Sequence, residues 1–215
     1  FIDCDSTFVK VETIDELARF SLSRDPDAEH KLRLITYITN QAMSGEIDFP
    51  SALEKRLEVI SITRDDVDKI TEHISTLVSD SFLESKELIK SLSDSIWILS
   101  GGFKEIIAPV VADFGVKEDH VLANSFIYRD DRVIGCERES DLFKEGGKTK
   151  AISKLNLDSD IFMIGDGFTD YEVQRDGPAS AFICYTENIS RESVLALSDY
   201  SADSFTEALE IINTI

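Results

Sequence analysis

The chain has 215 residues, 42% of them hydrophobic and 30% charged, which is typical of a globular protein of one or two domains with a substantial core. Acidic residues outnumber basic ones by 42 to 22, giving a formal net charge of −20, so a broad nucleic-acid or anionic-membrane surface is disfavoured. No apolar run approaches the roughly 20 residues that a membrane-spanning helix needs.

The first elements along the chain are a strand and a long helical block. Residues 1–9 begin as a strand and break into small polar residues. From residue 13 to about residue 78 the pattern is helical, with apolar side chains recurring at three- and four-residue spacing. Two amphipathic helices are expected over 51–60 and 63–77, the second with Thr63 as its N-cap. We therefore predict several consecutive helices directly after the first strand.

Beyond residue 78, predicted strands alternate with predicted helices. Alternation of this kind indicates a mostly parallel sheet with helices on both faces. We therefore predict an α/β fold, with a Rossmann-like parallel-sheet core made of residues 1–12 and 79–215. A small helical cap domain, residues 13–78, is inserted after the first strand. The strands are expected at 96–99, 121–128, 132–136, 161–164 and 181–184, with a hairpin around 130–131, and the helices at 103–114, 148–155, 191–197 and 204–212.

The cysteines indicate the cellular compartment. Cys4, Cys136 and Cys184 are odd in number, lie far apart and form no CxxC motif. This usage favours free thiols in a reducing environment, so we expect a cytoplasmic protein.

Four polar clusters stand at predicted strand ends or helix starts. Ligands of an open α/β sheet bind beyond the carboxyl ends of its strands, so these clusters are expected to form one site. Each cluster alone is usually a turn or a helix cap. Their joint order and spacing favour a functional site. The clusters are Asp3-Cys4-Asp5-Ser6-Thr7, Ser100-Gly101-Gly102, Gly146-Gly147-Lys148 and Gly165-Asp166-Gly167-Phe168-Thr169-Asp170.

This set of residue types suits phosphoryl transfer. A carboxylate such as Asp3 can attack phosphorus and form an acyl phosphate, while Asp5 donates a proton to the leaving group and later removes one from water. Mg²⁺ held by carboxylates, including Asp166, would offset the negative charge. Ser100 and nearby backbone N–H groups could hold phosphate oxygens, and Lys148 could neutralise the remaining charge.

The clusters resemble the four ordered motifs of the haloacid dehalogenase superfamily and, within it, those of the phosphoserine phosphatases. The resemblance covers nearly the whole chain and includes the helical insertion. Further matching segments are Glu12-Thr13-Ile14-Asp15-Glu16-Leu17-Ala18, Ala42-Met43, Phe49 and Lys55-Arg56-Leu57. The resemblance implies Asp3 as nucleophile and Mg²⁺ ligand, and Asp5 as general acid/base with its backbone carbonyl on the metal. It implies Asp166 as the third protein ligand and Asp170 as a supporting carboxylate.

The resemblance also implies which residues would hold the phosphoryl group. These are Ser100, Gly101 and Lys148, with Thr169 standing where some members have Asn. Lys150 is close enough to Lys148 that the lysine assignment could shift by two residues. Another departure is Cys4, which stands where Asp or Val is usual.

The far end of the substrate would meet the cap and its neighbourhood. By the same resemblance, Glu12 would bind the ammonium group and Arg56 the carboxylate of phosphoserine. Met43 and Phe49 would close over the substrate. Glu12 as a helix cap and Arg56 as a solvated surface charge are the alternatives.

The sequence thus predicts a phosphoric monoester hydrolase that converts O-phosphoserine and water to serine and phosphate, in serine biosynthesis, through an aspartyl-phosphate on Asp3. The expected partner is a small phosphorylated metabolite rather than nucleic acid or membrane, and the protein is expected to be a monomer or homodimer. The alternatives are a phosphatase for phosphoethanolamine, phosphocholine or a sugar phosphate, or a phosphotransferase of the same superfamily. A phospho-accepting signalling module is less favoured, because its single compact domain leaves no room for the insertion and needs no acid at Asp5.

Overall fold

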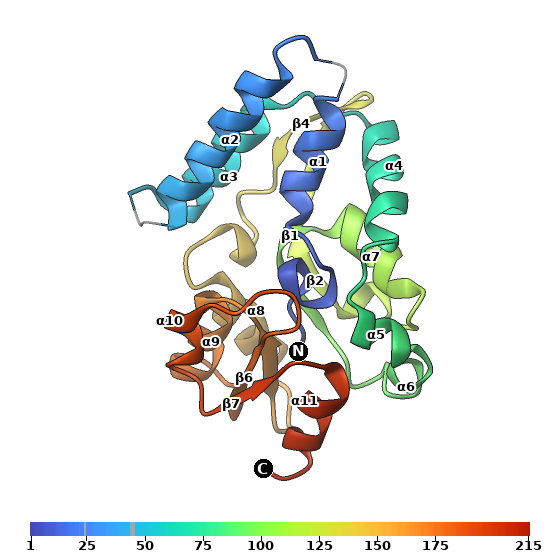
Figure 1. The fold of residues 1–215 in the computed structure, drawn as a ribbon, viewed down its shortest axis with the longest axis vertical. Helices are drawn as coiled ribbons and strands as arrows, with labels where there is room; N and C mark the ends of the chain where they lie inside the picture. The colour runs from blue at the N-terminus through green and yellow to red at the C-terminus, as the bar shows by residue number, and fades with distance from the viewer. Residues whose placement is uncertain (24, 44–45) are drawn as a thin grey trace.

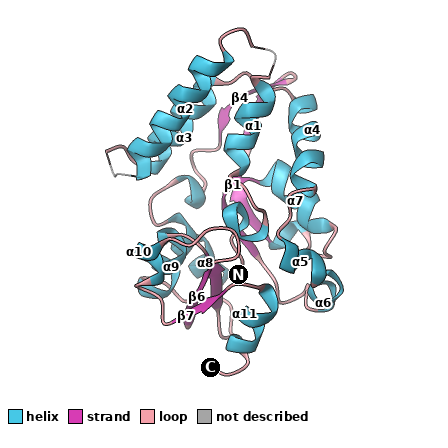
Figure 2. Cartoon of the chain, in the orientation of Figure 1, coloured by secondary structure: helices cyan, strands magenta, loops and turns pink. Residues whose placement is uncertain are grey.

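The computed structural model describes residues 1–23, 25–43 and 46–215, and within these the side chains of residues 40, 42 and 43 are outside the description. Figure 1 shows a lower half with the parallel strands and an upper half made mainly of long helices. Figure 2 shows strands at the centre of the lower half and helices around them. Within the described ranges, no helix combines the length and the apolar character that crossing a membrane requires.

The parallel sheet is completed by a single residue near the N-terminus. Ile2 pairs in parallel with both Ile98 and Ile164, and so joins a two-stranded to a three-stranded sheet. The backbone N–H of Asp3 donates to the Ile164 carbonyl oxygen at 2.9 Å. The resulting order is β2 (Val121–Asn124), β1 (Ile98–Phe103), Ile2, β5 (Phe162–Gly165), β6 (Ala181–Tyr185) and β7 (Tyr200–Ala202), with every pairing parallel.

Hydrophobic cores cover both faces of this sheet, as predicted. Successive side chains of a strand point to opposite faces, and in β6 Phe182 and Ile183 belong to two different buried clusters. Ile152, Val173 and Val194 cover the Phe182 face. The surrounding helices are α5 (Asp80–Glu84), α6 (Lys86–Ser91), α7 (Lys104–Ala112), α8 (Gly147–Leu155), α9 (Phe168–Arg175), α10 (Glu192–Leu195) and α11 (Phe205–Ile212).

The predicted helical block is confirmed as a run of four helices in the described part of residues 13–78. They are α1 (Thr13–Ser21), α2 (Ala28–Met43), α3 (Phe49–Val59) and α4 (Arg64–Ser75). Local sequence explains where two of them begin. Asp48 accepts a hydrogen bond from the Ser51 N–H at 2.7 Å. The Asp66 carboxylate accepts the Thr63 N–H at 2.8 Å, and the Thr63 hydroxyl oxygen accepts the Asp66 N–H at 3.2 Å, so the two residues form a reciprocal cap at the start of α4.

The predicted hairpin forms from β3 (Phe126–Arg129) and β4 (Arg132–Cys136), but it lies against the helical block. The N–H of Val133 donates to Ile62 O at 2.9 Å. The Arg64 guanidinium stacks over the Tyr128 ring at 3.7 Å. These contacts join residues more than 60 positions apart, so local patterns gave no sign of them. The hairpin therefore links the helical block to the part of the chain that follows residue 78.

Two strand boundaries differ from the prediction. The strand expected at 96–99 runs from Ile98 to Phe103, so Ser100, Gly101 and Gly102 lie within it, at a shift in register. The strand expected at 121–128 is divided into β2, which pairs with β1, and β3, which pairs with β4. Residues 1–9 begin in the sheet at Ile2 and then leave it, as predicted, and residues Cys4–Phe8 coil into a wide turn, η1. The three cysteines are free and buried.

Candidate active site

The turn η1 directly follows Asp3 and contains Asp5. Ser6 adopts a left-handed backbone conformation with φ 56°, which turns the chain back sharply after Asp5. The side-chain amide of Asn188 donates to the Ser6 and Thr7 carbonyl oxygens at 3.1 and 3.2 Å. The turn is therefore held from outside by a distant segment of the chain.

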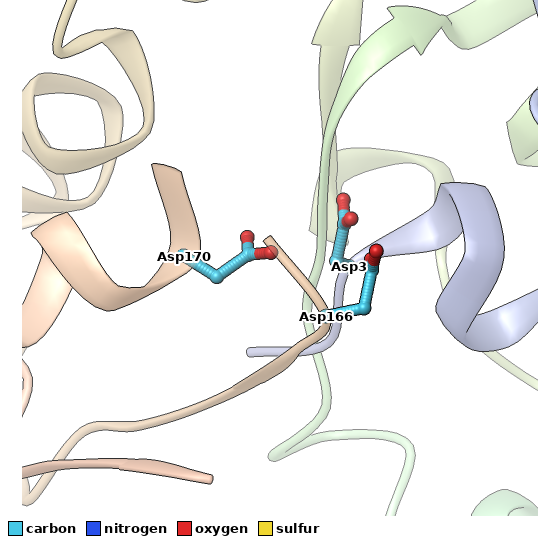
Figure 3. Close-up of side chains that lie close together, drawn as sticks. All are labelled: Asp3, Asp166 and Asp170. Carbon is cyan, nitrogen blue, oxygen red and sulfur yellow. The ribbon is translucent and has the colours of Figure 1, made fainter. Parts of the chain in front are cut away.

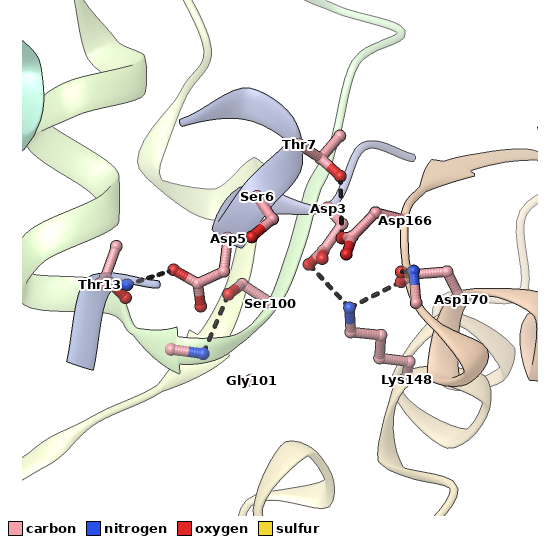
Figure 4. A network of polar contacts seen from close by, with 12 residues as sticks. Asp3, Asp5, Ser6, Thr7, Thr13, Ser100, Gly101, Lys148, Asp166 and Asp170 are labelled. Carbon is pink, nitrogen blue, oxygen red and sulfur yellow. Dashed lines mark hydrogen bonds and ion pairs between the residues drawn. The ribbon is translucent and has the colours of Figure 1, made fainter. Parts of the chain in front are cut away.

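Three carboxylates converge at this edge. Asp3, Asp166 and Asp170 are all buried, and one oxygen from each lies within 4.8 Å of the others. Figure 3 shows the three side chains close together. Lys148 Nζ donates to Asp3 Oδ1 and to Asp170 Oδ1, both at 2.7 Å (Figure 4). The structure thus brings together four of the predicted site residues from three separate motifs.

Glycines make this convergence possible. A side chain at Gly165 would place its Cβ 2.4 Å from Asp170 Cγ, so only glycine lets that carboxylate lie against the end of β5. A Cβ at Gly147 would lie 2.2 Å from the Asp141 carbonyl oxygen. This close approach at the start of α8 sets the position of Lys148.

The electrostatics of the cluster are dominated by burial. Desolvation, reinforced by the charge of Asp170, raises the pKa of Asp3 well above its usual value. Desolvation likewise raises the pKa of Asp170, with Lys148 opposing. Burial alone would lower the pKa of Lys148, but Asp170 and Asp3 override it and hold that pKa above its usual value. The negative charge of these buried carboxylates therefore favours the binding of an additional cation.

The donor set fits a hard divalent cation such as Mg²⁺. Carboxylate oxygens are its preferred protein ligands, and the Asp3, Asp166 and Asp170 oxygens lie close enough together to share one ion. The Asp5 carboxylate turns away from this group and accepts the Thr13 N–H at 2.8 Å (Figure 4). Coordination through the Asp5 backbone carbonyl stays a prediction.

The segment Ser100–Gly102 lies beside the cluster and touches the helical block. Ser100 is fully buried, and its Oγ accepts the Gly102 N–H at 2.9 Å. A Cβ at Gly101 would lie 3.1 Å from Cζ of Phe49, the first residue of α3. The fold thus brings Phe49 onto the predicted phosphate-binding segment, although the two are 52 residues apart.

Glu12 directly precedes α1, and Arg56 lies in α3. Glu12 Oε1 accepts the Ser6 hydroxyl at 2.9 Å, and 47% of the Glu12 side chain is exposed. Desolvation at the edge of the acidic cluster, with the charge of Asp5, raises the pKa of Glu12 to about 7. Arg56 is 9% exposed, and among the described residues its Nε donates one long hydrogen bond, 3.4 Å, to Ala52 O. Burial lowers the Arg56 pKa.

Nearby acids partly offset the burial of Arg56. The charges of Asp15, Glu12 and Asp5 act to raise the Arg56 pKa, yet among the described residues no carboxylate lies within 4.0 Å of its guanidinium. Arg56 is therefore a buried cation rather than the solvated surface charge considered as the alternative.

Three further predictions concern Thr169, Met43 and the choice between Lys148 and Lys150. Thr169 is exposed in the first turn of α9, and no side-chain hydrogen bond to it occurs in the described part of the chain. Met43 ends α2, but its side chain lies outside the described residues. Lys150 Nζ donates to the Glu145 carbonyl oxygen at the surface, so Lys148 is the lysine that faces the carboxylates.

Sequence reasoning missed one charged residue at the site. Arg191, just before α10, donates from Nε to Asp166 Oδ2 at 2.8 Å, and its Nη2 lies 3.8 Å from Glu12 Oε1. Thr7 donates to the other Asp166 oxygen at 3.2 Å. Thr7 stood in a recognised cluster, whereas no motif surrounds Arg191.

Comparison with known proteins agrees with this geometry. A family model described as haloacid dehalogenase-like hydrolase matches residues 1–175. Phosphoserine phosphatase of Bos taurus is 30% identical over 96% of this chain and 89% of that protein. A phosphoserine phosphohydrolase-like protein from Francisella tularensis has a solved structure that matches with a TM-score of 0.82 and 31% identity, over 98% of this chain and 97% of that chain. A substrate-bound phosphoserine phosphatase complex shares the fold, with a TM-score of 0.74 and 24% identity over 100% of this chain and 96% of that chain.

Proposed function

This chain belongs to the haloacid dehalogenase-like hydrolase family, and on that premise we propose that it is a Mg²⁺-dependent phosphatase that hydrolyses O-phosphoserine. The observation that carries the proposal is the buried group of Asp3, Asp166 and Asp170 with Lys148 paired to two of them. Relatives at about 30% identity that are named phosphoserine phosphatases support the choice of substrate.

In the proposed reaction Asp3 and Asp5 divide the chemistry. An Asp3 oxygen attacks phosphorus and the bond to the serine oxygen breaks, leaving an acyl phosphate on Asp3. Asp5 protonates the departing serine oxygen, a role that its raised pKa, caused by desolvation, favours. Asp5 then removes a proton from the water that attacks the phosphorus and frees Asp3. Bound Mg²⁺, held by Asp3 and Asp166 with the Asp5 carbonyl, would offset charge on the phosphoryl oxygens.

The phosphoryl group itself would be held by the neighbouring motifs. Ser100 and the backbone of Gly101 supply hydrogen-bond donors, and Lys148 supplies positive charge at 2.7 Å from Asp3. Asp170 keeps Lys148 in place from the other side. Thr169, exposed in the first turn of α9, would add a hydroxyl donor to the phosphate.

We propose that residues 13–78 form a cap over a core of residues 1–12 and 79–215. The contact of Phe49 with the Gly101 position supports this division, because a cap residue already lies over the phosphate segment. Phe49 and Met43 would exclude water from the bound substrate and strengthen its polar contacts.

Substrate choice would depend on the two charges at the cap side. Glu12 would pair with the ammonium and Arg56 with the carboxylate of phosphoserine. The burial of Arg56 and the distance of every described carboxylate from it support this role, because its guanidinium stays available for an incoming anion.

Arg56→Ala should lower kcat/KM for phosphoserine. The loss should correspond to about 2–4 kcal/mol of transition-state stabilisation, the range for losing one partner of a desolvated charge pair. The rate with p-nitrophenyl phosphate, which lacks a carboxylate, should hardly change. Lys55→Ala, which removes the exposed neighbouring cation on α3, is the matched control and should alter neither rate. Equal losses on both substrates would assign Arg56 to the fold instead.

The raised pKa of Glu12 predicts a pH effect specific to phosphoserine. Above about pH 7 Glu12 is ionised and can pair with the ammonium, and below it the protonated group cannot. The ratio of kcat/KM for phosphoserine to that for p-nitrophenyl phosphate should therefore rise as pH increases through about 7. Glu12→Gln should flatten this ratio. A ratio that is already independent of pH in the unaltered protein would contradict the role of Glu12.

A phosphate-release screen tests the proposed substrate. The panel contains phosphoserine, phosphothreonine, phosphoethanolamine, phosphocholine and sugar phosphates, each with Mg²⁺ and with excess chelator. We expect the highest kcat/KM for phosphoserine and no release in chelator. A preference for a substrate without a carboxylate would contradict the substrate assignment, and full activity in chelator would contradict the metal.

A further inference from the structure

The segment between β6 and α10 is fixed against the turn that carries Asp3. Besides its bonds to Ser6 and Thr7, the Asn188 amide donates to Ser79 Oγ at 2.7 Å. The Thr186 N–H donates to Ala202 O at 2.9 Å. Hydrogen bonds from Asn188 and Thr186 therefore hold the segment in place before Arg191.

From this segment Arg191 reaches one oxygen of Asp166. Nε donates to Oδ2 at 2.8 Å, while Thr7 donates to the other oxygen, Oδ1, at 3.2 Å. Nη2 lies 3.8 Å from Glu12 Oε1, so the guanidinium is held at two ends. With a donor on each oxygen, rotation of the Asp166 carboxylate about its last bond is restricted.

We propose that Arg191 is a positioning residue that sets the orientation of the Asp166 carboxylate for the divalent cation. Hydrogen bonds to a ligating carboxylate hold its oxygens in the orientation that coordination requires, and losing such a bond commonly weakens metal binding. Thr7 alone, through its longer hydrogen bond to Oδ1, would leave Oδ2 without a donor among the described residues. The inference rests on the metal site of the proposed function, but not on the identity of the phosphate ester.

The charge of Arg191 acts in the opposite direction to its hydrogen bond. A positive group next to a cation site repels the cation, so removing it would by itself strengthen metal binding. Because 27% of the Arg191 side chain is exposed, solvent screens this repulsion. The hydrogen bond to Asp166, whose side chain is 5% exposed, is directional and has no comparable screening. We therefore expect the loss of orientation to exceed the relief of repulsion.

Calorimetric titration of the metal-stripped, full-length protein with Mg²⁺ tests the proposal. Arg191→Met should weaken Mg²⁺ binding by roughly 10–100-fold, and the Mg²⁺ concentration for half-maximal phosphate release should rise by the same factor. Arg191→Lys should recover most of the affinity, since an ammonium can still donate to Asp166. Arg175→Met, which removes an arginine paired with Asp176 at the surface, is the matched control and should leave the affinity unchanged.

Unchanged or stronger Mg²⁺ binding in Arg191→Met would overturn the proposal. If that variant does not fold, as judged by thermal unfolding, Arg191→Gln supplies the test, because its shorter uncharged side chain changes Arg191 itself and leaves the bonds from Asn188 to the turn η1 in place. A smaller weakening is expected there, and unchanged binding would overturn the proposal. Failure of the unaltered protein to bind Mg²⁺ would instead contradict the proposed function.

Discussion

Asp3→Asn is expected to reduce phosphoserine turnover on the order of 10⁶-fold, the scale seen when a catalytic nucleophile is removed. An amide oxygen is too weak a nucleophile to attack phosphorus, although the side chain fills the same volume. The Asn carbonyl oxygen can still accept the Lys148 hydrogen bond that Asp3 Oδ1 accepts at 2.7 Å. Steady-state phosphate release measures the loss, and thermal unfolding of the metal-free protein should show that the fold is retained.

Asp158→Asn is the matched control for this variant. Asp158 is an exposed acid in the loop between α8 and β5, so its substitution makes the same change in charge away from the site. Its turnover should equal that of the unaltered protein. Turnover in Asp3→Asn within about tenfold of the unaltered rate would mean that another group attacks phosphorus.

Asp5→Asn is expected to slow phosphoserine hydrolysis by roughly 10²–10⁴-fold, the contribution typical of a general acid/base. The serine alkoxide is a poor leaving group and needs the proton that Asp5 would donate. The fold should be kept, because an Asn side-chain oxygen can still accept the Thr13 N–H that Asp5 accepts at 2.8 Å.

The choice of substrate provides the control for Asp5. The p-nitrophenolate ion leaves without prior protonation, so p-nitrophenyl phosphate should lose less in the first step than phosphoserine does. Normal rates with phosphoserine in Asp5→Asn would refute the acid/base role. Equal losses on both substrates would restrict Asp5 to the second step, the activation of water.

Much of the fold could be predicted because the sequence contains strong local signals. An apolar run followed by a polar cluster marked the end of β5, and parallel pairing through Ile2 brings Asp3 next to that end. The helical block and the Thr63 cap follow from side-chain periodicity and a reciprocal hydrogen bond. Asp3, Asp166, Asp170 and Lys148 consequently meet as the motifs implied.

What could not be predicted depends on contacts between distant segments. No local pattern shows that Val133 will bond to Ile62, or that the hairpin will lie on the helical block. Arg191 stands in an ordinary helix-start sequence, and it reaches Asp166 only because Asn188 fixes the preceding segment. The predicted strand ends at residue 99, whereas β1 continues through Ser100 to Phe103. This continuation depends on pairing with β2, with a shift in register between Leu99 and Phe103, which the local sequence does not show.

Trapping the covalent intermediate tests the central claim, hydrolysis through a phosphate carried on Asp3, most directly. Asp5→Asn is mixed with Mg²⁺ and p-nitrophenyl phosphate labelled in the phosphoryl group, whose leaving group needs no proton from Asp5, then quenched in acid and digested for peptide mapping. Because loss of the base slows attack by water, the label should accumulate on the peptide that contains Asp3 and be absent in the Asp3→Asn, Asp5→Asn double variant. Label on another residue, or equal labelling in the double variant, would contradict the account.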